Sequence, residues 1–352
     1  MEKLKHYIVI RKWMPYNNTK SEKSRLQKWS RHMRNYRQRY KIAAVAVLAI
    51  LSFGACTKTD EKEQDAYKQY GINCMENGDY DNAVKSFQNA LNQSLGKVGE
   101  KEIDICLYKA KAQIYSGDVS GALETYDAVI DYNQNAGAYY LRGQLYFDMG
   151  EPEKGLADYK KAIEEDGENY ELFIAVYESL SQHEMEQDGQ KYLNQAMEIK
   201  GKKAKDQLYK GRISYLLGDM NGAVEYLTKA KEEKEPLAAY YLGLAYKNAG
   251  EKEKAEECLQ EYIDSGVATS YDLYDLGMKE MEDENYKDAV TYFEAGLGLE
   301  EVPNHQNLLK STIAAYEYRG KFKTARKLLK EYLSQYPSDE EAQRESIFLE
   351  TR

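Results

Sequence analysis

A pattern of small and turn-forming positions recurs along the chain from about residue 64 onward. A residue that is usually Gly or Ala is followed seven positions later by a turn residue, and five positions after that by a second small residue. The copies are Gly71, Gly78 and Ala83; Ala110, Gly117 and Ala122; Gly143, Gly150 and Gly155; Gly211, Gly218 and Ala223; Gly243, Gly250 and Ala255; Gly277, Glu284 and Ala289; and Ile313, Gly320 and Ala325. Self-similarity at a fixed period near thirty-four residues indicates a repeat architecture.

Each copy predicts two α-helices joined by a tight turn. A small first position lets the first helix (helix A) approach the second (helix B) closely, and the turn Gly supplies the positive φ that ends helix A. An acid such as Asp79, Asp118 or Asp219 follows the turn, where it suits the start of helix B. The pattern therefore predicts an all-α chain of helical hairpins.

An eighth, weaker copy lies between the third and fourth clear ones. Its small positions are read as Ile174 and Gly189, which stand fifteen residues apart instead of twelve. This spacing predicts a hairpin with about three extra residues near Ser181 to Asp188. About eight hairpins are then expected over residues 64–337. After Pro337, a C-terminal capping helix over 338–352 is expected to cover the end of the stack with Ile347, Phe348 and Leu349.

The spacing resembles that of the tetratricopeptide repeat family. Aromatic residues three past the first small position (Tyr146, Tyr246, Tyr316) and four past the last (Phe87, Tyr159, Phe293) add to the resemblance. It implies a right-handed α-solenoid that acts by binding a protein or peptide partner. Because the motif residues are packing residues, most of the tyrosines are interpreted as hairpin core.

The resemblance also implies where a partner would bind. In this family the A helices line an inner, concave groove. The corresponding positions here form an aromatic and Met-rich surface, which favours an extended peptide or a helix of a partner protein. They are Tyr140, Gln144, Phe147, Arg212, Tyr215, Leu216, Tyr240, Leu244, Lys247, Tyr271, Tyr274, Met278 and Met281.

The N-terminal part has a different character. An uncharged run over residues 42–53 follows Arg37, Arg39 and Lys41 and precedes Gly54, Ala55 and Cys56, which is the layout of an export signal. The last three residues resemble the lipobox of bacterial lipoproteins, although Phe53 stands where Leu is usual. The resemblance implies a leader over 1–55, lipidation of Cys56 and a tether over 56–63. Translation starting at Met33 and an uncleaved signal anchor are alternatives.

Charge separates the same two regions. Residues 1–55 hold 13 Lys or Arg and only two acids, so the rest of the chain holds 36 basic and 57 acidic residues. An acidic body should repel nucleic acid and favours a cationic or neutral partner. The basic residues of the leader, which include an aromatic set at Trp13, Trp29, Tyr36 and Tyr40, are better explained by membrane orientation of the signal than by nucleic-acid binding.

Candidate chemistry is sparse. The four histidines are isolated, so paired motifs supply neither a metal cage nor a His-based general base. Cys74, Cys106 and Cys258 are expected to be buried free thiols. No cofactor and no enzymatic activity are expected. The sequence therefore predicts a non-catalytic scaffold or adaptor, lipid-anchored on the extracytoplasmic side of a bacterial membrane. A sensor that binds a glycan or small molecule in the aromatic groove is the alternative.

Overall fold

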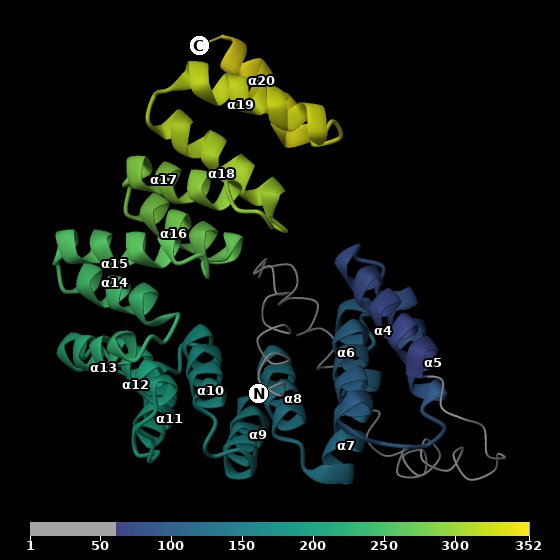
Figure 1. Cartoon of the computed structure of the whole chain (residues 1–352). Helices are drawn as coiled ribbons and strands as arrows, with labels where there is room; N and C mark the ends of the chain where they lie inside the picture. The colour runs from purple at the N-terminus through teal and green to yellow at the C-terminus, as the bar shows by residue number, and fades with distance from the viewer. Residues whose placement is uncertain (1–60, 352) are drawn as a thin grey trace. The chain divides into compact units, whose positions relative to one another are not determined.

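The computed structural model describes residues 61–351, which form helices α4 to α20 and contain no strand (Figure 1). Residues 1–60, which include the predicted leader, Cys56 and most of the tether, lie outside the described residues, as does residue 352. Within the described part, no helix has both the length and the hydrophobicity needed to cross a bilayer.

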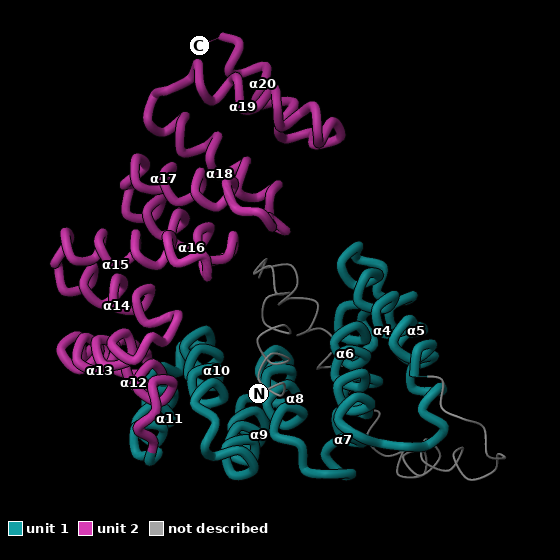
Figure 2. The backbone as a smooth tube through the Cα atoms, viewed as in Figure 1, with its two compact units in different colours: residues 1–200 teal, residues 201–352 magenta. Residues whose placement is uncertain are grey.

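The described chain divides into two compact units, which are coloured separately in Figure 2. Unit 1 extends to residue 200 and contains four hairpins. Its helices pair as α4 (Glu61–Glu76) with α5 (Tyr80–Gln93), α6 (Glu100–Ser116) with α7 (Val119–Asn133), α8 (Ala136–Asp148) with α9 (Pro152–Glu165), and α10 (Tyr170–Gln182) with α11 (Glu186–Met197).

Unit 2 begins at residue 201 and contains four more hairpins and a final single helix. Its helices are α12 (Ala204–Leu216) with α13 (Met220–Glu232), α14 (Ala238–Asn248) with α15 (Lys252–Asp264), α16 (Ser270–Glu282) with α17 (Tyr286–Leu297), α18 (His305–Tyr318) with α19 (Phe322–Gln335), and α20 (Glu340–Glu350). The predicted eight hairpins and C-terminal helix are confirmed.

The small positions of the sequence pattern are the points of closest helix approach. A Cβ added at Gly143 of α8 would lie 2.7 Å from the Tyr159 ring of α9, and one added at Gly277 of α16 would lie 2.3 Å from the Phe293 ring of α17. The turn glycines have positive φ, for example +73° at Gly150. Each A helix can therefore end sharply and leave its B helix in direct contact.

The aspartates after the turns cap their B helices as predicted, whereas the side chains of Glu151 and Glu251 form no capping hydrogen bond at the starts of α9 and α15. Asp118 accepts a hydrogen bond at 2.9 Å from the backbone amide of Gly121, and Asp219 accepts one at 2.9 Å from that of Gly222. These bonds satisfy amides that have no partner inside the helix.

The predicted insertion in the fourth hairpin is wrong. Its turn residue is Glu184, whose φ of +62° is the conformation that glycine adopts in other hairpins. Counting from Glu184, the first small position belongs to Tyr177 and the second to Gly189, at the ordinary spacing. The two residues touch, because a Cβ at Gly189 would lie 2.9 Å from the Tyr177 ring. The large residue lies on helix A here, and the glycine on helix B makes room for it.

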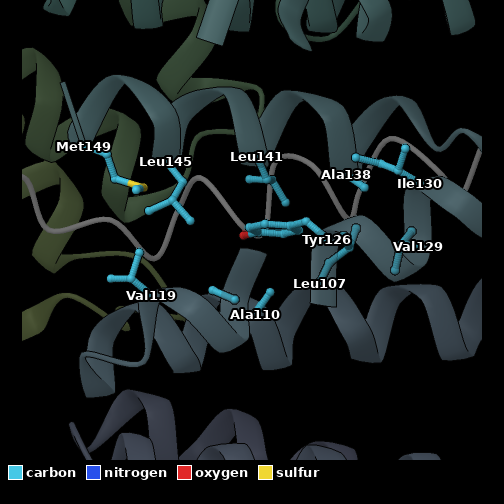
Figure 3. Packing of buried hydrophobic residues seen from close by; sticks show 11 residues of the cluster. Leu107, Ala110, Val119, Tyr126, Val129, Ile130, Ala138, Leu141, Leu145 and Met149 are labelled. Carbon is cyan, nitrogen blue, oxygen red and sulfur yellow. The ribbon is translucent and has the colours of Figure 1, made fainter. Parts of the chain in front are cut away.

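Tyrosine and aliphatic side chains fill the space between helices, as the sequence predicts. The buried Tyr126 ring lies among Leu107, Ala110 and Leu141, which come from the second and third hairpins (Figure 3). Buried tyrosine hydroxyls find partners: Tyr159 and Ser179 share a hydrogen bond of 2.5 Å between their hydroxyl oxygens. Such pairing removes most of the cost of burying the polar end of the ring.

Helix α20 covers the end of unit 2, but with fewer of its side chains than expected. Ala342 and Leu349 are buried against α18 and α19, and the carboxylate of Asp339 caps α20 while it accepts a 2.6 Å hydrogen bond from the Tyr332 hydroxyl. Ile347 and Phe348 were also expected to cover this end. They point outward instead, with exposed fractions of 67% and 44%.

The first prediction concerns close packing. We expect Gly277→Ala to lower the free energy of unfolding by about 1–3 kcal/mol, because the new methyl group must displace the Phe293 ring. Gly298→Ala is the matched control, since a Cβ there would meet nothing closer than 3.5 Å. Urea denaturation followed by circular dichroism measures both. Equal effects of the two substitutions would contradict this account of the hairpin.

A second prediction concerns pH. Burial and the neighbouring Glu345 of α20 raise the pKa of Glu317 to about 7. The folded chain thus keeps a proton that the unfolded chain loses, so this group stabilises the fold below pH 4.5 and loses that effect as pH rises to 7. Glu317→Gln should raise the melting temperature at pH 8 and change it less at pH 5. Glu331→Gln, an exposed substitution on α19, should show no such difference between the two pH values.

Candidate partner-binding surface

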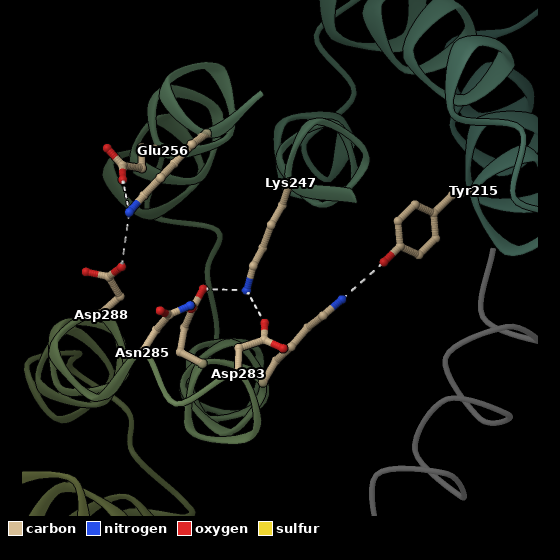
Figure 4. A network of polar contacts seen from close by, with 9 residues as sticks. Tyr215, Lys247, Glu256, Asp283, Asn285 and Asp288 are labelled. Atoms are coloured by element: carbon tan, nitrogen blue, oxygen red, sulfur yellow. Dashed lines mark hydrogen bonds and ion pairs between the residues drawn. The ribbon is translucent and has the colours of Figure 1, made fainter. Parts of the chain in front are cut away.

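The surface formed by the A helices of a unit is called its A-helix wall. Some neighbouring A helices contact each other directly along it. α4 packs against α6 in unit 1, and in unit 2 α12 packs against α14 and α16 against α18. In unit 2 the Lys279 ammonium of α16 donates a 3.3 Å hydrogen bond to the Tyr215 hydroxyl of α12 (Figure 4). This bond joins a side chain of the fifth hairpin to one of the seventh.

Three of the predicted groove residues lie in unit 1. Tyr140 is half-buried, and its hydroxyl accepts a 2.9 Å hydrogen bond from Gln144 and donates one of 3.4 Å to the carbonyl of Ala175 on α10. Phe147 is buried, with its ring stacked on those of Tyr159 and His183. Tyr140 and Gln144 can meet a ligand on the A-helix wall, whereas Phe147 packs between the helices.

The other ten predicted residues lie in unit 2, and the first of them are on α12. Arg212, Tyr215 and Leu216 are half-buried. The Arg212 guanidinium lies over the Tyr241 ring at 4.6 Å and near the Tyr209 ring at 5.5 Å. Within residues 61–351 Arg212 forms no ion pair, and the contacts of its guanidinium are cation–π interactions with these two rings.

The α14 residues differ from one another in exposure. Tyr240 is half-buried, with its ring at 4.9 Å from that of Tyr241, and burial raises its pKa. Leu244 is buried and belongs to the core between the sixth and seventh hairpins. Lys247 remains partly accessible and forms ion pairs across to α16. Of the predicted set, therefore, Phe147 and Leu244 are core residues in the structure.

Lys247 is the centre of the polar network in Figure 4. Its ammonium lies 2.7 Å from a Glu280 carboxylate oxygen and 2.9 Å from one of Asp283. Asn285 donates a 3.0 Å hydrogen bond to the other Glu280 oxygen. Burial disfavours the charged form of Lys247, but the Glu280 and Asp283 carboxylates favour it more strongly, so the pKa of Lys247 is raised. The hydrogen bond from Lys247 lowers the pKa of Asp283. The network connects the sixth and seventh hairpins.

The residues of α16 give the wall its soft, aromatic character. Tyr271, Tyr274, Met278 and Met281 are all half-buried. Tyr274, Met278 and Met281 lie beside the buried cluster of the seventh hairpin, and the Ser311 hydroxyl of α18 lies 3.7 Å from the Met278 sulfur. A surface of this kind can adapt to apolar side chains of a ligand.

The family's groove positions did not include three residues that contact neighbouring A helices, two near the C-terminal end of α16 and one directly after it. Lys279, Glu280 and Asp283 contact α12 or α14 although none of them stands at a predicted groove position. The spacing of Lys247 and Glu280, close to one repeat length, is the signal that could have identified the ion pair.

The described residues offer little for catalysis. No group of three His, Cys, Asp or Glu residues within them could hold a metal ion. Cys74, Cys106 and Cys258 are free in this part of the chain, and burial raises the pKa of Cys106 to about 11, so its thiol is not activated as a nucleophile. What the A-helix wall of unit 2 offers is a set of rings, thioethers and cations suited to binding.

Family comparison agrees with this geometry. One tetratricopeptide repeat model matches residues 136–169, which include the third hairpin, and a second such model matches 237–265 and 306–339, which include the sixth and most of the eighth. The chain carries tetratricopeptide repeats. Its described part is an all-α tetratricopeptide-repeat solenoid, and proteins with these repeats generally serve as protein-interaction scaffolds.

Solved structures of tetratricopeptide-repeat proteins resemble the chain at low identity. A tetratricopeptide repeat protein from Parabacteroides merdae ATCC 43184 is 15% identical, covers 72% of this chain and 99% of its own, and gives a TM-score of 0.43. PilW, a type IV pilus biogenesis factor, is 18% identical over 60% of this chain and 98% of its own, with a TM-score of 0.40. No curated protein matches the sequence.

A third prediction tests the network between these repeats. Lys247→Met should lower the free energy of unfolding by about 1–3 kcal/mol, because the buried Glu280 carboxylate loses its cation. Adding Glu280→Gln should recover part of the loss. Lys252→Met is the control, since that side chain is 72% exposed and its ion pairs lie in solvent. Equal losses for Lys247→Met and Lys252→Met in urea denaturation would refute the assignment.

Proposed function

We propose that this protein is a non-catalytic scaffold or adaptor that binds a segment of a partner protein on the A-helix wall of unit 2. The observation that carries the proposal is the group formed by Arg212, Tyr215 and Lys279. Tyr215 stands three residues after Arg212 on α12 and accepts the hydrogen bond of Lys279 from α16, while the Arg212 guanidinium lies over the Tyr241 ring of α14.

The electrostatic setting supports binding at this group. Lys247, nearby on the same wall, is neutralised by two carboxylates, whereas neither Arg212 nor Lys279 forms an ion pair among residues 61–351. Their N–H groups remain suited to the carbonyl or carboxylate oxygens of a peptide. Tyr271, Tyr274 and Met278 supply adjacent apolar area for its side chains.

The same proposal places the protein at the outer surface of a bacterial membrane. Its support is the uncharged run over 42–53, the basic residues before it, and Gly54, Ala55 and Cys56 directly after it. Cleavage before Cys56 and addition of a diacylglycerol there would hold the solenoid at the membrane surface. A tether over residues 56–63 spans at most about 28 Å when extended, so partners would be other envelope proteins.

The binding proposal is tested by affinity capture from envelope extract with two double variants of equal charge change. Arg212→Ala with Lys279→Ala should reduce recovery of the captured protein at least tenfold. Arg326→Ala with Lys327→Ala, two exposed cations of α19, should leave recovery unchanged. Equal recovery with both variants would overturn the assignment of the wall, and recovery of a carbohydrate in place of a protein would favour the sensor alternative.

The membrane proposal is tested by intact-mass analysis of protein purified from membranes in detergent. We expect loss of residues 1–55 and an added acyl-glyceryl mass, and we expect Cys56→Ala to lack both changes. An unmodified mass that retains the leader would exclude lipidation and leave the signal-anchored alternative.

A further inference from the structure

Helix α20 has the position of an A helix, and part of its outer side is exposed within the described residues. In the third and seventh hairpins the first small position, Gly143 or Gly277, stands eight residues after the N-cap of helix A. The residue eight after the α20 N-cap, Asp339, is Ile347. In the other two hairpins this position is covered by a ring of helix B, whereas Ile347 is 67% exposed.

The exposed side of α20 is a narrow apolar stripe between charges. Arg344, Ile347 and Phe348 are exposed and, at spacings of three and four residues, lie on one side of the helix. Glu350 is also exposed and follows Ile347 by three residues. Ala342 and Leu349 lie on the opposite side, where they attach α20 to the eighth hairpin. The stripe can therefore be covered without disturbing that attachment.

We propose that this stripe binds the same stripe of a second copy of the chain, with the two α20 helices antiparallel. A twofold axis beside Ile347 brings the two Ile347 side chains together. It also places Arg344 of each copy opposite Glu350 of the other, because these residues stand three before and three after Ile347. Neither Arg344 nor Glu350 forms an ion pair within residues 61–351. The stripe is thus self-complementary in charge, with an apolar residue on the axis, as a twofold interface requires.

Two features favour a second copy over an unrelated helix. The sign of the charge changes across the apolar centre of the stripe, so a uniformly basic or acidic partner helix would meet a like charge at one end. The exposed Ile347 also stands at the centre of this pairing, so each copy covers the same apolar side chain of the other. One helix pair buries little area, so the contact is expected to be weak and to depend on concentration.

Sedimentation equilibrium of the full-length chain, with all variants in the same detergent, tests the proposal. The unsubstituted chain should show a monomer–dimer equilibrium, and Ile347→Lys should weaken it at least tenfold. Val267→Lys, which adds the same charge at a 40% exposed residue after α15, should not. Arg344→Glu and Glu350→Arg should each weaken the dimer, and the double variant should restore it. A monomer at all concentrations, or no restoration in the double variant, would overturn the proposal.

Cysteine crosslinking in the full-length chain gives a second readout that locates the axis. Ile347→Cys should form an intermolecular disulfide on mild oxidation. Glu340→Cys should not, because it lies seven residues from the axis and its two copies would be about 20 Å apart. Crosslinking of Glu340→Cys as efficient as that of Ile347→Cys would exclude this antiparallel pairing. Helical circular dichroism equal to that of the unsubstituted chain confirms that each variant is folded.

Discussion

The close approach of two helices within each hairpin is the constraint on which the rest of the structure depends. Where helix A and helix B cross, one side must have almost no side chain so that the other can place a ring or a branched aliphatic group against the backbone. Gly143 accepts Tyr159 in this way, and Gly277 accepts Phe293. The fourth hairpin meets the same constraint in reverse, since Tyr177 on helix A contacts Gly189 on helix B. At this crossing the ring lies on helix A and the glycine on helix B, so the two helices exchange roles while their close packing is kept.

This exchange explains which part of the fold could be predicted from the sequence and which could not. Most hairpins followed from the spacing of small residues, because a glycine turn and a small crossing residue are both visible in the chain. The fourth was misaligned because neither its turn residue, Glu184, nor its first crossing residue, Tyr177, is small; the seventh hairpin also turns at a glutamate, Glu284, but keeps Gly277. A search for small residues then selected Ile174. The positive φ of Glu184 identifies the turn in the structure, but a glutamate in the sequence does not predict that conformation.

The candidate site has the same mixture of predictable and unpredictable parts. Position within a repeat determines which face of helix A a residue occupies, and Tyr215, Tyr271 and Met278 of the predicted set are half-buried. The exposure of Phe147 and Leu244 depends instead on how closely the next hairpin packs, and both are buried. Contacts between repeats depend on that packing as well. For this reason neither the ion pairs of Lys247 nor the bond between Tyr215 and Lys279 follows from position alone.

These contacts also separate stability from recognition on one surface. The motif residues are used in the helix crossings, so the proposed recognition would depend on the side chains between them. Among those, Lys247 has its charge balanced by Glu280 and Asp283, and its role is to join neighbouring hairpins. Arg212 and Lys279 contact tyrosines instead, through a ring face and a hydroxyl. A cation held by an aromatic partner is oriented but not neutralised, and can therefore still attract an oxygen ligand. In a body with an excess of acids, that difference supports the proposed assignment of Arg212 and Lys279 to binding and of Lys247 to the contact between hairpins.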